Sequence, residues 1–564
     1  MNHNFGDNDY VNIDDTGEAK PKKAPRRGGE VKALIVTLVV ALALLYIQLP
    51  AINLKSEGFY SYICIVLIVY TIARLPAVIR KTDFDFRNVG RRNLKPLITV
   101  FYPAVVMLVL VGLCMIGALL SSPIIRAGAY RELITVEPGS FTEDVAAVTF
   151  DQVPMLDKAS AQVLGNRKLG ELSDLVSQFE VAGNYNQINF KSRPVRVTPL
   201  EYGDFYKWIG NRTQGLPAYI TVDMLSQEVT VQRLQAGMKY SMSEPFFRNT
   251  YRVLRFRYPT YMFSNPVFEI DDAGTPYWIC PRVTNTIGLF GGRDAIGAVL
   301  MNAQTGEMQY LAIGDIPQWV DAVYNADLII EQYDYYGRYQ GGFWNSIFGQ
   351  KGMTMTTAGY NYLALNDDVY VYTGITSVGG DESNIGFILT NQRTKATKFY
   401  AIPGAEEYSA MSSAEGVVQH LAYNATFPLL LNVYNQPTYF MALKDNAQLV
   451  KMYAMVNVSS YQIVATGTSI AECQRAYIQL IQNNGIIEPG ESEGTVSGVI
   501  EEIRTAVIDG NSIYYIKLAG EEGYFSISAI ADSTVVVLSV GDEVEIGYSL
   551  RQEGITPALS IKLK

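Results

Sequence analysis

The most regular feature of the chain is a set of three long apolar runs close to its N-terminus. The runs cover residues 33–52, 59–79 and 97–120, and no later stretch of the sequence is as long and as apolar. A helix needs about 20 apolar residues to cross the roughly 30 Å hydrocarbon core of a bilayer. The pattern therefore predicts three transmembrane helices in residues 32–121, preceded by a disordered tail in residues 1–31.

Basic residues flank these runs unevenly, and this predicts the orientation of the helices. The loop between the first and second runs holds only Lys55, beside Glu57, whereas the tail and the loop between the second and third runs are strongly basic. Loops rich in Lys and Arg remain on the cytoplasmic side of a membrane. We expect a multi-pass protein of the plasma membrane, embedded in the lipid bilayer, with a cytoplasmic N-terminus and with residues after about 121 extracytoplasmic. The basic residues are Lys20, Lys22, Lys23, Arg26, Arg27, Lys32, Arg80, Lys81, Arg87, Arg91, Arg92 and Lys95.

Residues 122–488 mix two shorter periodicities. Helical spacing of apolar residues occurs in residues 159–179, 412–423 and 469–483. Alternation of apolar and polar residues, typical of half-buried strands, occurs in residues 217–223, 266–279 and 437–453. We expect a tandem α+β region with antiparallel sheets, divided into one domain over residues 122–290 and a second over residues 291–488.

Two stretches of this region resemble each other. Residues 296–313 read IGAVLMNAQTGEMQYLAI and residues 385–402 read IGFILTNQRTKATKFYAI, each with the pattern of a strand, a polar turn and a second strand. A lone two-stranded hairpin is marginally stable and needs neighbours to bury its apolar face. We interpret the pair as a duplicated α+β unit, with chance similarity between two hairpins as the alternative. The identical pairs are Ile296/Ile385, Gly297/Gly386, Leu300/Leu389, Asn302/Asn391, Thr305/Thr394, Ala312/Ala401 and Ile313/Ile402.

Residues 300–311 contain, in order, an apolar strand, Asn302, two further residues, Thr305-Gly306-Glu307 and a returning strand. This pattern resembles the PepSY module, a cystatin-like sheet packed on a helix. The second copy departs from the motif, with Lys395-Ala396 in place of Gly-Glu. Such modules occur in tandem outside the membrane in bacterial membrane-anchored proteins. The resemblance implies a non-catalytic module that binds or restrains a partner protein, often a peptidase. It covers residues 297–313, 385–402 and 437–455.

The last part of the chain has the pattern of a separate small domain. Residues 489–494 are Pro, Gly, Ser and Glu with no apolar anchor, which is typical of a linker. Residues 495–564 contain five short alternating segments, with Asp509-Gly510 as a hairpin turn and Gly541-Asp542 before the fourth segment. The strand number and turn positions resemble an OB-fold, so we expect a five-stranded OB-like β-barrel.

Composition and charge exclude several classes of function. The chain has 564 residues, of which 18% are charged, and only two histidines, His3 and His420. This scarcity argues against a zinc or His-rich metal centre, and we expect no metal site and no cofactor. Of the 45 Lys and Arg residues 14 precede residue 121, as do 9 of the 55 Asp and Glu residues, which leaves a net charge of −15 for the remainder. A region this acidic repels phosphate backbones, so we expect no nucleic-acid partner.

Catalytic motifs are weak throughout the sequence. Gly490–Gly494 matches G-x-S-x-G around Ser492, but in a linker rather than between a strand and a helix. Adjacent carboxylates occur at 367–368, 381–382 and 406–407, yet a glycosidase needs two carboxyl groups that face each other across a cleft. The turn at 381–384 has oxygen ligands for Ca²⁺ without EF-hand spacing. We assign no catalytic residue, and a single disulfide between Cys280 and Cys473 stays open.

The densest unusual stretch is the aromatic segment at residues 333–348. Aromatic residues with glycines and one arginine are typical of interface hot spots and of sugar-stacking surfaces. The alternative is that these rings pack in the core. The candidate binding residues are Tyr335, Tyr336, Arg338, Tyr339, Phe343 and Trp344.

These features favour a non-enzymatic, membrane-anchored extracytoplasmic protein that binds, holds or regulates a partner protein at the cell envelope. Two alternatives stay open. One is a carboxylate-dependent envelope hydrolase that acts on glycan or peptide. The other is an accessory subunit of a membrane transport complex.

Overall fold

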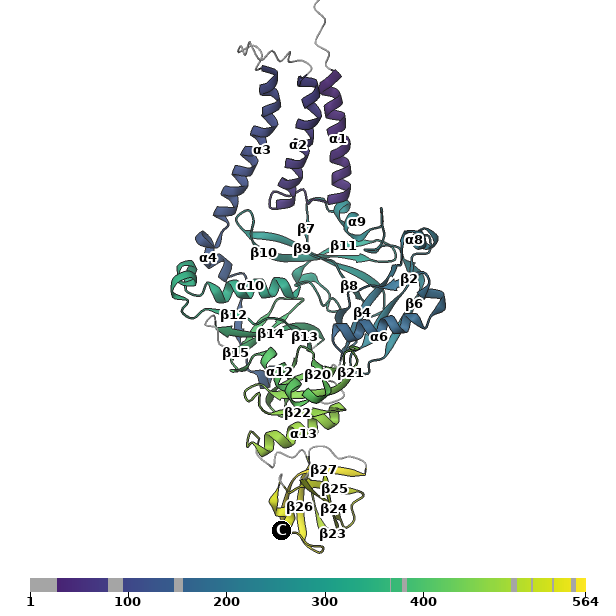
Figure 1. Ribbon diagram of the computed structural model, residues 1–564, viewed down its shortest axis with the longest axis vertical. Coiled ribbons are helices and arrows are strands. Elements are labelled where there is room, and N and C mark those ends of the chain that lie inside the picture. The colour runs from purple at the N-terminus through teal and green to yellow at the C-terminus, as the bar shows by residue number, and fades with distance from the viewer. Residues whose placement is uncertain are drawn as a thin grey trace, which may run out of the picture. The chain divides into compact units, whose positions relative to one another are not determined.

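The computed structural model describes residues 28–79, 95–146, 156–365, 367–377, 383–487, 494–508, 511–529, 532–548 and 554–564. The chain divides into two compact units. The first is formed by Met1–Leu120 together with Leu254–Met262, and the second by Ser121–Val253 and Phe263–Lys564. Figure 1 shows the elements in chain order by colour.

The three apolar runs form three helices, as predicted. They are α1 (Gly28–Gln48), α2 (Glu57–Ile79) and α3 (Lys95–Leu120), and each contains a window that is long and apolar enough to cross a membrane. Most of their apolar side chains are exposed in the isolated chain, as expected for surfaces that face lipid. Arg74 of α2 forms a 3.2 Å ion pair with Glu30 in the first turn of α1, so the charge inside the second run has a partner.

The segment Leu254–Met262 belongs to this first unit although it is distant in sequence. The Ile52 amide donates to the Pro259 carbonyl at 2.8 Å, and the Asn53 side chain donates to the Thr260 carbonyl at 2.9 Å. The Arg255 guanidinium donates to the Leu49 carbonyl, just beyond the end of α1. These bonds attach the segment to the loop that joins α1 and α2.

The described residues of the second unit form four largely antiparallel sheets that share one topology. In each sheet, two short strands pair with the same third strand, the third strand pairs with a fourth, and the fourth pairs with a fifth. The first two repeats use β2 (Phe179–Val181), β3 (Asn186–Phe190), β4 (Arg193–Tyr202), β5 (Leu216–Asp223), β6 (Val229–Met238), then β7 (Met262–Phe263), β8 (Val267–Ile270), β9 (Pro276–Ile287), β10 (Gly291–Asn302) and β11 (Met308–Ala312). The last two use β12 (Thr354–Thr356), β13 (Asn361–Leu365), β14 (Asp368–Ser377), β15 (Ser383–Asn391), β16 (Thr397–Tyr400), then β18 (Asn424–Ala425), β19 (Leu429–Val433), β20 (Gln436–Lys444), β21 (Val450–Asn457) and β22 (Val464–Gly467).

A helix precedes each sheet, and one more follows the last. These helices are α6 (Lys158–Gly170), α9 (Thr250–Arg257), α10 (Ala326–Arg338), α12 (Glu407–Val417) and α13 (Ile470–Asn483). The third sheet is extended by β17 (Gly404–Ala405) and by β1 (Val136–Pro138), which is parallel to β16. The remaining helices are α4 (Pro123–Arg131), α5 (Phe141–Asp144), α7 (Ser173–Val176), α8 (Phe205–Asn211) and α11 (Gly342–Trp344).

The turn between the fourth and fifth strands is built in the same way in all four repeats. Each fourth strand ends in Asp223, Asn302, Asn391 or Asn457. In each case the side-chain Oδ1 accepts a backbone N–H three residues later, at 2.9–3.0 Å. Asp and Asn favour this self-capped turn because their short side chains reach their own backbone. The internal repeat seen in the sequence, residues 296–313 and 385–402, covers only the second and third of these four turns.

The repeat found in the sequence lies at equivalent positions of two consecutive sheets. Residues 296–313 include most of β10 and β11, and residues 385–402 include most of β15 and β16. Lys395 adopts a left-handed φ of +65°, close to the +76° of Gly306, so the departure from the Gly-Glu motif keeps the same turn. Its ammonium forms a 2.7 Å ion pair with Asp294, which helps to offset the cost of this backbone conformation.

Residues 494–564 form a closed barrel of five strands in the order β23-β24-β25-β27-β26. All five predicted segments are strands, and β25 and β27 are the parallel pair. The barrel has its own core, which includes Ile516, Phe525 and Ile546. The strands are β23 (Gly494–Ile508), β24 (Asn511–Leu518), β25 (Tyr524–Ser528), β26 (Glu543–Tyr548) and β27 (Ile555–Leu563).

Some expected boundaries differ from the structure or lie outside it. The helix expected over 159–179 ends at Gly170, and only a short α7 follows, because Glu171–Leu172 turn the chain. The expected division at residue 290 falls in the turn between β9 and β10, which pair along their length in one sheet. Most of the expected tail and linker, and the Asp381-Glu382 pair, lie outside the described residues.

The glycines of the repeat permit close approach of an aromatic ring from the next strand. A Cβ on Gly386 would overlap the Tyr400 carbonyl oxygen and come within 2.8 Å of the Phe399 ring. We expect Gly386→Ala to lower stability by about 1–3 kcal/mol through overpacking. Gly416→Ala is the matched control, because that helical position has no atom within 4 Å of a new Cβ. Thermal unfolding of the detergent-solubilised protein measures both, and equal midpoints would contradict the expectation.

Candidate functional site

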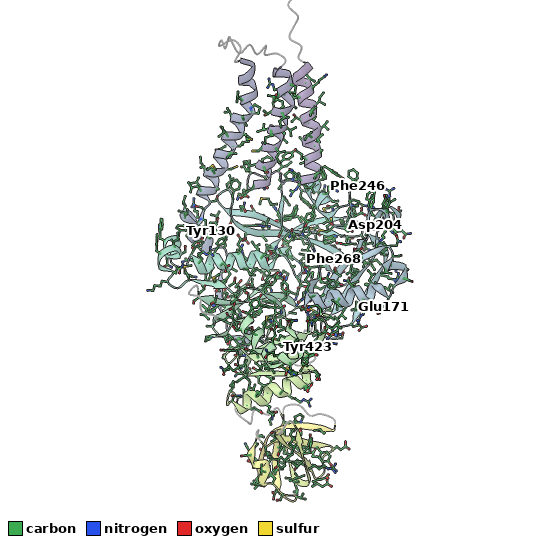
Figure 2. All side chains as sticks on the ribbon, viewed as in Figure 1. Tyr130, Glu171, Asp204, Phe246, Phe268 and Tyr423 are labelled. Atoms are coloured by element: carbon green, nitrogen blue, oxygen red, sulfur yellow. The ribbon has the colours of Figure 1, made fainter. Side chains whose placement is uncertain are left out.

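A cleft of about 570 Å³ in the second unit is the best candidate site among the described residues. It is lined by the first sheet, the start of the second sheet and residues around β13. Its volume lies in the range of small-molecule and peptide sites, and its walls combine aromatic rings with a few polar groups. Figure 2 labels Phe268, one of the lining residues. Other lining residues are Tyr185, Arg196, Trp278, Tyr360, Tyr362 and Phe427.

Arg196 is the chemically distinctive residue of the cleft. It lies on β4, the central strand of the first repeat, and only 4% of it is exposed. Its guanidinium donates to the Leu156 carbonyl and to the Gln187 side-chain oxygen, both at a long 3.4 Å. Burial lowers the pKa of Arg196 to about 10, so the group remains cationic at neutral pH. No described carboxylate forms an ion pair with it.

The carboxylate whose charge acts on Arg196 is already engaged elsewhere. Asp157 caps the N-terminus of α6 by accepting the Ser160 amide at 3.0 Å, and it forms a 2.6 Å ion pair with the buried Lys444. Burial would raise the pKa of Asp157, but the hydrogen bonds from Lys444 and Ser160 outweigh this and hold the pKa below its ordinary value. The cleft therefore keeps a buried cation whose compensation is incomplete, which favours an anionic ligand.

Two further polar groups, one lining the cleft and one bonded to Arg196, are unsatisfied among the described residues. The Tyr185 hydroxyl is buried against Gly165 of α6 without a hydrogen-bond partner, and so is Nε2 of Gln187, which adjoins Arg196. Burial raises the pKa of Tyr185 well above its ordinary range, so the hydroxyl stays protonated and is available as a donor. Buried polar groups are normally paired, so such groups mark a place where a bound group or water completes the bonding.

A pair of buried carboxylates lies behind the cleft wall. Glu269 accepts the amides of Asp321 and Ala322 at 2.9 Å, and the Asn186 side chain at 3.4 Å. Asp321 accepts the Asn189 amide at 2.7 Å through Oδ2, while Oδ1 is buried without a partner. Burial, and then the charge of Glu269, raise the pKa of Asp321 well above its ordinary value. Burial also raises the pKa of Glu269, to about 7, although its three hydrogen-bond donors act in the opposite direction, so the pair holds at least one proton below that pH.

The histidine and the two cysteines of this region do not line the cleft. His420 is exposed in a 3-10 turn after α12, and Cys280 and Cys473 are buried and free rather than disulfide-bonded. Burial raises the pKa of both thiols, which opposes formation of a thiolate. Within the described ranges, no group of three or more His, Cys, Asp or Glu residues is placed to hold a metal ion.

The six residues predicted as a binding surface are divided among different environments. Tyr335, Tyr339 and Phe343 pack with Tyr130 in one small core, with a 4.7 Å ring separation between Tyr130 and Tyr335. Tyr336 packs in another cluster with Tyr333 and Ile375.

Only two of the six are exposed. Trp344 stacks on Phe348 at 5.9 Å, and Arg338 lies at the surface. The six side chains therefore do not share one face, and most of the aromatic area serves packing.

Of the carboxylate pairs that the hydrolase alternative needs, those at 367–368 and 406–407 do not line the cleft, and the pair at 381–382 lies outside the described residues. Asp368 is held by Arg393 through two 2.8 Å bonds. Glu407 is fully buried, where the Tyr372 hydroxyl donates to it at 2.7 Å and Thr357 at 3.0 Å. Both groups are bonded as structural carboxylates, and neither lines the cleft.

Comparison with known proteins gives no match: no protein-family model matches the chain, and no curated protein sequence matches it.

Sequence reasoning missed Arg196, Glu269 and Asp321. Arg196 and Glu269 lie on strands whose pattern resembles half-buried edge strands with a polar outer face, yet both faces of these strands are buried. The one available signal is the single arginine among apolar residues in RPVRVTPL, residues 193–200. A charge in such a segment is expected to be either exposed or functional.

Replacing the buried cation tests the cleft directly. We expect acetate, with chloride at equal ionic strength as reference, to raise the unfolding temperature of the wild type but not of Arg196→Met. Saturation at about 100 times Kd corresponds to about 2.7 kcal/mol. Without acetate the variant should be at least as stable as the wild type, because an incompletely paired buried charge is removed. Arg193→Met, on the exposed end of the same strand, is the control, and equal acetate effects in both variants would contradict the assignment.

The carboxylate pair predicts a pH dependence. Because the folded protein keeps a proton on Asp321 that the unfolded chain releases near pH 4, stability is highest below that pH and falls as pH rises. Each group with a raised pKa contributes a slope of at most about 1.4 kcal/mol per pH unit. Glu269, whose pKa burial raises to about 7, contributes as well. Asp321→Asn should therefore reduce the slope of the urea unfolding midpoints between pH 4.5 and 7.5 without abolishing it, whereas the exposed control Asp272→Asn should leave it unchanged. A wild-type midpoint that rises over this range would disprove the proton assignment.

Proposed function

We propose that the chain is a membrane-anchored extracytoplasmic binding protein that holds a partner protein at the cell envelope. The cleft at Arg196 receives a carboxylate-bearing segment of that partner. The observation that carries the proposal is the buried guanidinium, which faces a cleft with aromatic walls and has no ion pair with a described carboxylate. A carboxylate accepts two parallel hydrogen bonds from a guanidinium, so this ligand matches both charge and shape.

Membrane anchoring is supported by the length and hydropathy of α1, α2 and α3. The proposed orientation rests on the basic tail and the basic loop between α2 and α3. Three spans put the chain after α3 on the same side as the loop between α1 and α2. The hydrogen bonds of Leu254–Met262 to that loop agree with this arrangement.

A binding role is also supported by the architecture. Four repeats of a helix followed by an antiparallel sheet agree with the proposed PepSY-like character, which implies binding or restraint of a protein. The barrel order 1-2-3-5-4, with the third and fifth strands parallel, agrees with an OB-like fold. Arg504, Lys517 and Lys564 of the barrel each pair with a glutamate, which favours a protein partner over a nucleic acid.

Photocrosslinking in native membranes tests the proposal. Benzoylphenylalanine at Tyr360, which lines the cleft and is 37% exposed, should give a discrete protein adduct. Arg196→Met should abolish this adduct, because the carboxylate loses its counter-charge, while Arg193→Met should keep it.

The same photoreactive residue at Tyr461 is the positional control, since it is 45% exposed and does not line the cleft. An adduct at Tyr360 that persists in Arg196→Met, or that forms equally at Tyr461, would overturn the assignment of the cleft. Absence of any adduct at Tyr360 would count against a partner protein there.

A further inference from the structure

One exposed aromatic stretch of the second unit is explained neither by packing nor by the cleft. It comprises α11 and the π-helical turn η3 (Asn345–Gly349) that follows it, and is here named the aromatic turn. Phe348 is 79% exposed, Trp344 is 65% exposed, and Ile347 is about half exposed. The rings of Trp344 and Phe348 stack at 5.9 Å, so they share one apolar surface. Contiguous exposed apolar groups of this kind mark an interaction site.

Hydrogen bonds hold the aromatic turn in one conformation. The Asn345 side chain donates to the Lys351 carbonyl at 3.0 Å and accepts the Lys351 amide at 3.2 Å. The Gln350 amide donates to the Asn345 carbonyl at 2.7 Å, and the Ser346 hydroxyl donates to the Phe343 carbonyl at 2.7 Å. These bonds close the turn on itself. A turn that is already ordered loses little conformational entropy when it binds.

The start of the aromatic turn packs against α4. The Phe343 ring lies against a small core that contains Tyr339 and Tyr130 of α4, the latter labelled in Figure 2. Beyond this core, α4 presents Ile124 and Ile125, each about half exposed. The aromatic turn and α4 are therefore neighbouring elements of the second unit, and both have exposed apolar side chains.

The covalent connection keeps α4 near the third candidate span in any arrangement of the two units. Leu120 ends α3 and Pro123 begins α4, with only Ser121 and Ser122 between them. An extended chain spans at most about 3.6 Å per residue, so Pro123 lies within about 11 Å of the end of α3. If α3 crosses a membrane, the start of α4 therefore lies at or next to the lipid headgroups.

The charge of both elements suits an anionic surface. Residues 121–131 contain two arginines, residues 339–353 contain one lysine, and neither stretch contains Asp or Glu. Arg126 and Lys351 are exposed and form no ion pair with a described carboxylate, whereas Arg131 lies 3.8 Å from Glu132. The chain after residue 120 has a net charge of −15, so this cationic character is local. An anionic lipid bilayer combines negative charge at its surface with an apolar interior.

We propose that the aromatic turn and the start of α4 form an interfacial contact with the membrane surface at which α3 ends. Trp344, Ile347 and Phe348 enter the boundary between headgroups and acyl chains, where such side chains are enriched. Arg126 and Lys351 bind lipid phosphates. The inference rests on the proposed membrane anchoring, which supplies the bilayer, but it is independent of the cleft and its partner.

Nitroxide labelling of the full chain in nanodiscs tests the contact. Single cysteines replace Phe348, Tyr461 or Leu113 after the two cysteines of the spans are changed to alanine, while the two buried cysteines of the second unit remain. Power saturation compares collisions with oxygen, which partitions into lipid, and with a water-soluble nickel chelate. In phosphatidylglycerol-containing discs we expect the ratio of oxygen to chelate collisions to be several-fold higher at 348 than at 461, an exposed control position between β21 and β22.

The three positions separate the possible failures. Position 113 lies in α3, and dominance of the chelate there would overturn membrane anchoring itself. Dominance of oxygen at 113 with equal ratios at 348 and 461 would overturn the interfacial contact alone. Low collision rates with both reagents at 348 would show that protein covers the aromatic turn, and would overturn a contact with lipid.

Lipid charge tests the part of the basic residues. Lys351→Gln should reduce the gain in oxygen access at 348 that phosphatidylglycerol gives over pure phosphatidylcholine. Arg475→Gln, which removes an exposed cation of α13, should leave that gain unchanged. Equal oxygen access at 348 in both lipids would contradict binding of lipid phosphates by the basic residues.

Discussion

The second unit depends on one constraint: a sheet of short strands cannot bury both of its faces with a single helix. The third strand of every repeat nevertheless has buried residues on both faces, as in β4, β9, β14 and β20. One core shows how this is achieved, because it combines residues of β14–β16 with residues of β19–β22, α12 and α13. Neighbouring repeats therefore complete each other's core, and we infer that a single repeat in isolation would be marginal.

This constraint also explains where the unusual polar chemistry lies. A charged residue on a strand that is buried on both faces cannot reach bulk water, so it must be bonded inside or must face a gap between repeats. Glu269 is bonded inside, by three donors from neighbouring segments. Arg196 has only two long bonds to described residues and lines the cleft. The candidate site is thus a consequence of how the repeats meet. A ligand that supplies the missing negative charge would offset the free-energy cost of burying the Arg196 cation.

Local patterns predicted the elements well, because each depends on residues close in sequence. The apolar runs gave the three helices, and the polar turns after Asn302 and Asn391 gave the hairpins. The fourfold repeat was not visible, because the turn needs only a short side-chain oxygen and a backbone N–H three residues later. Asp223 and Asn457 satisfy the same geometry among different neighbours. The shared property is a hydrogen-bond pattern, which sequence identity records only in part.

Side-chain direction was harder to predict than element type. It determines which of the candidate binding residues at 335–344 are buried and which are exposed. On α10 a spacing of four residues places Tyr335 and Tyr339 on the face that packs against Tyr130, and Tyr336 points elsewhere. One aromatic-rich stretch was therefore read as one surface although its helix divides it between two cores. Residues 245–263 are also rich in aromatic residues, yet Phe247 is 78% exposed. Burial, and not residue content, therefore distinguishes rings that pack in a core from rings at the surface.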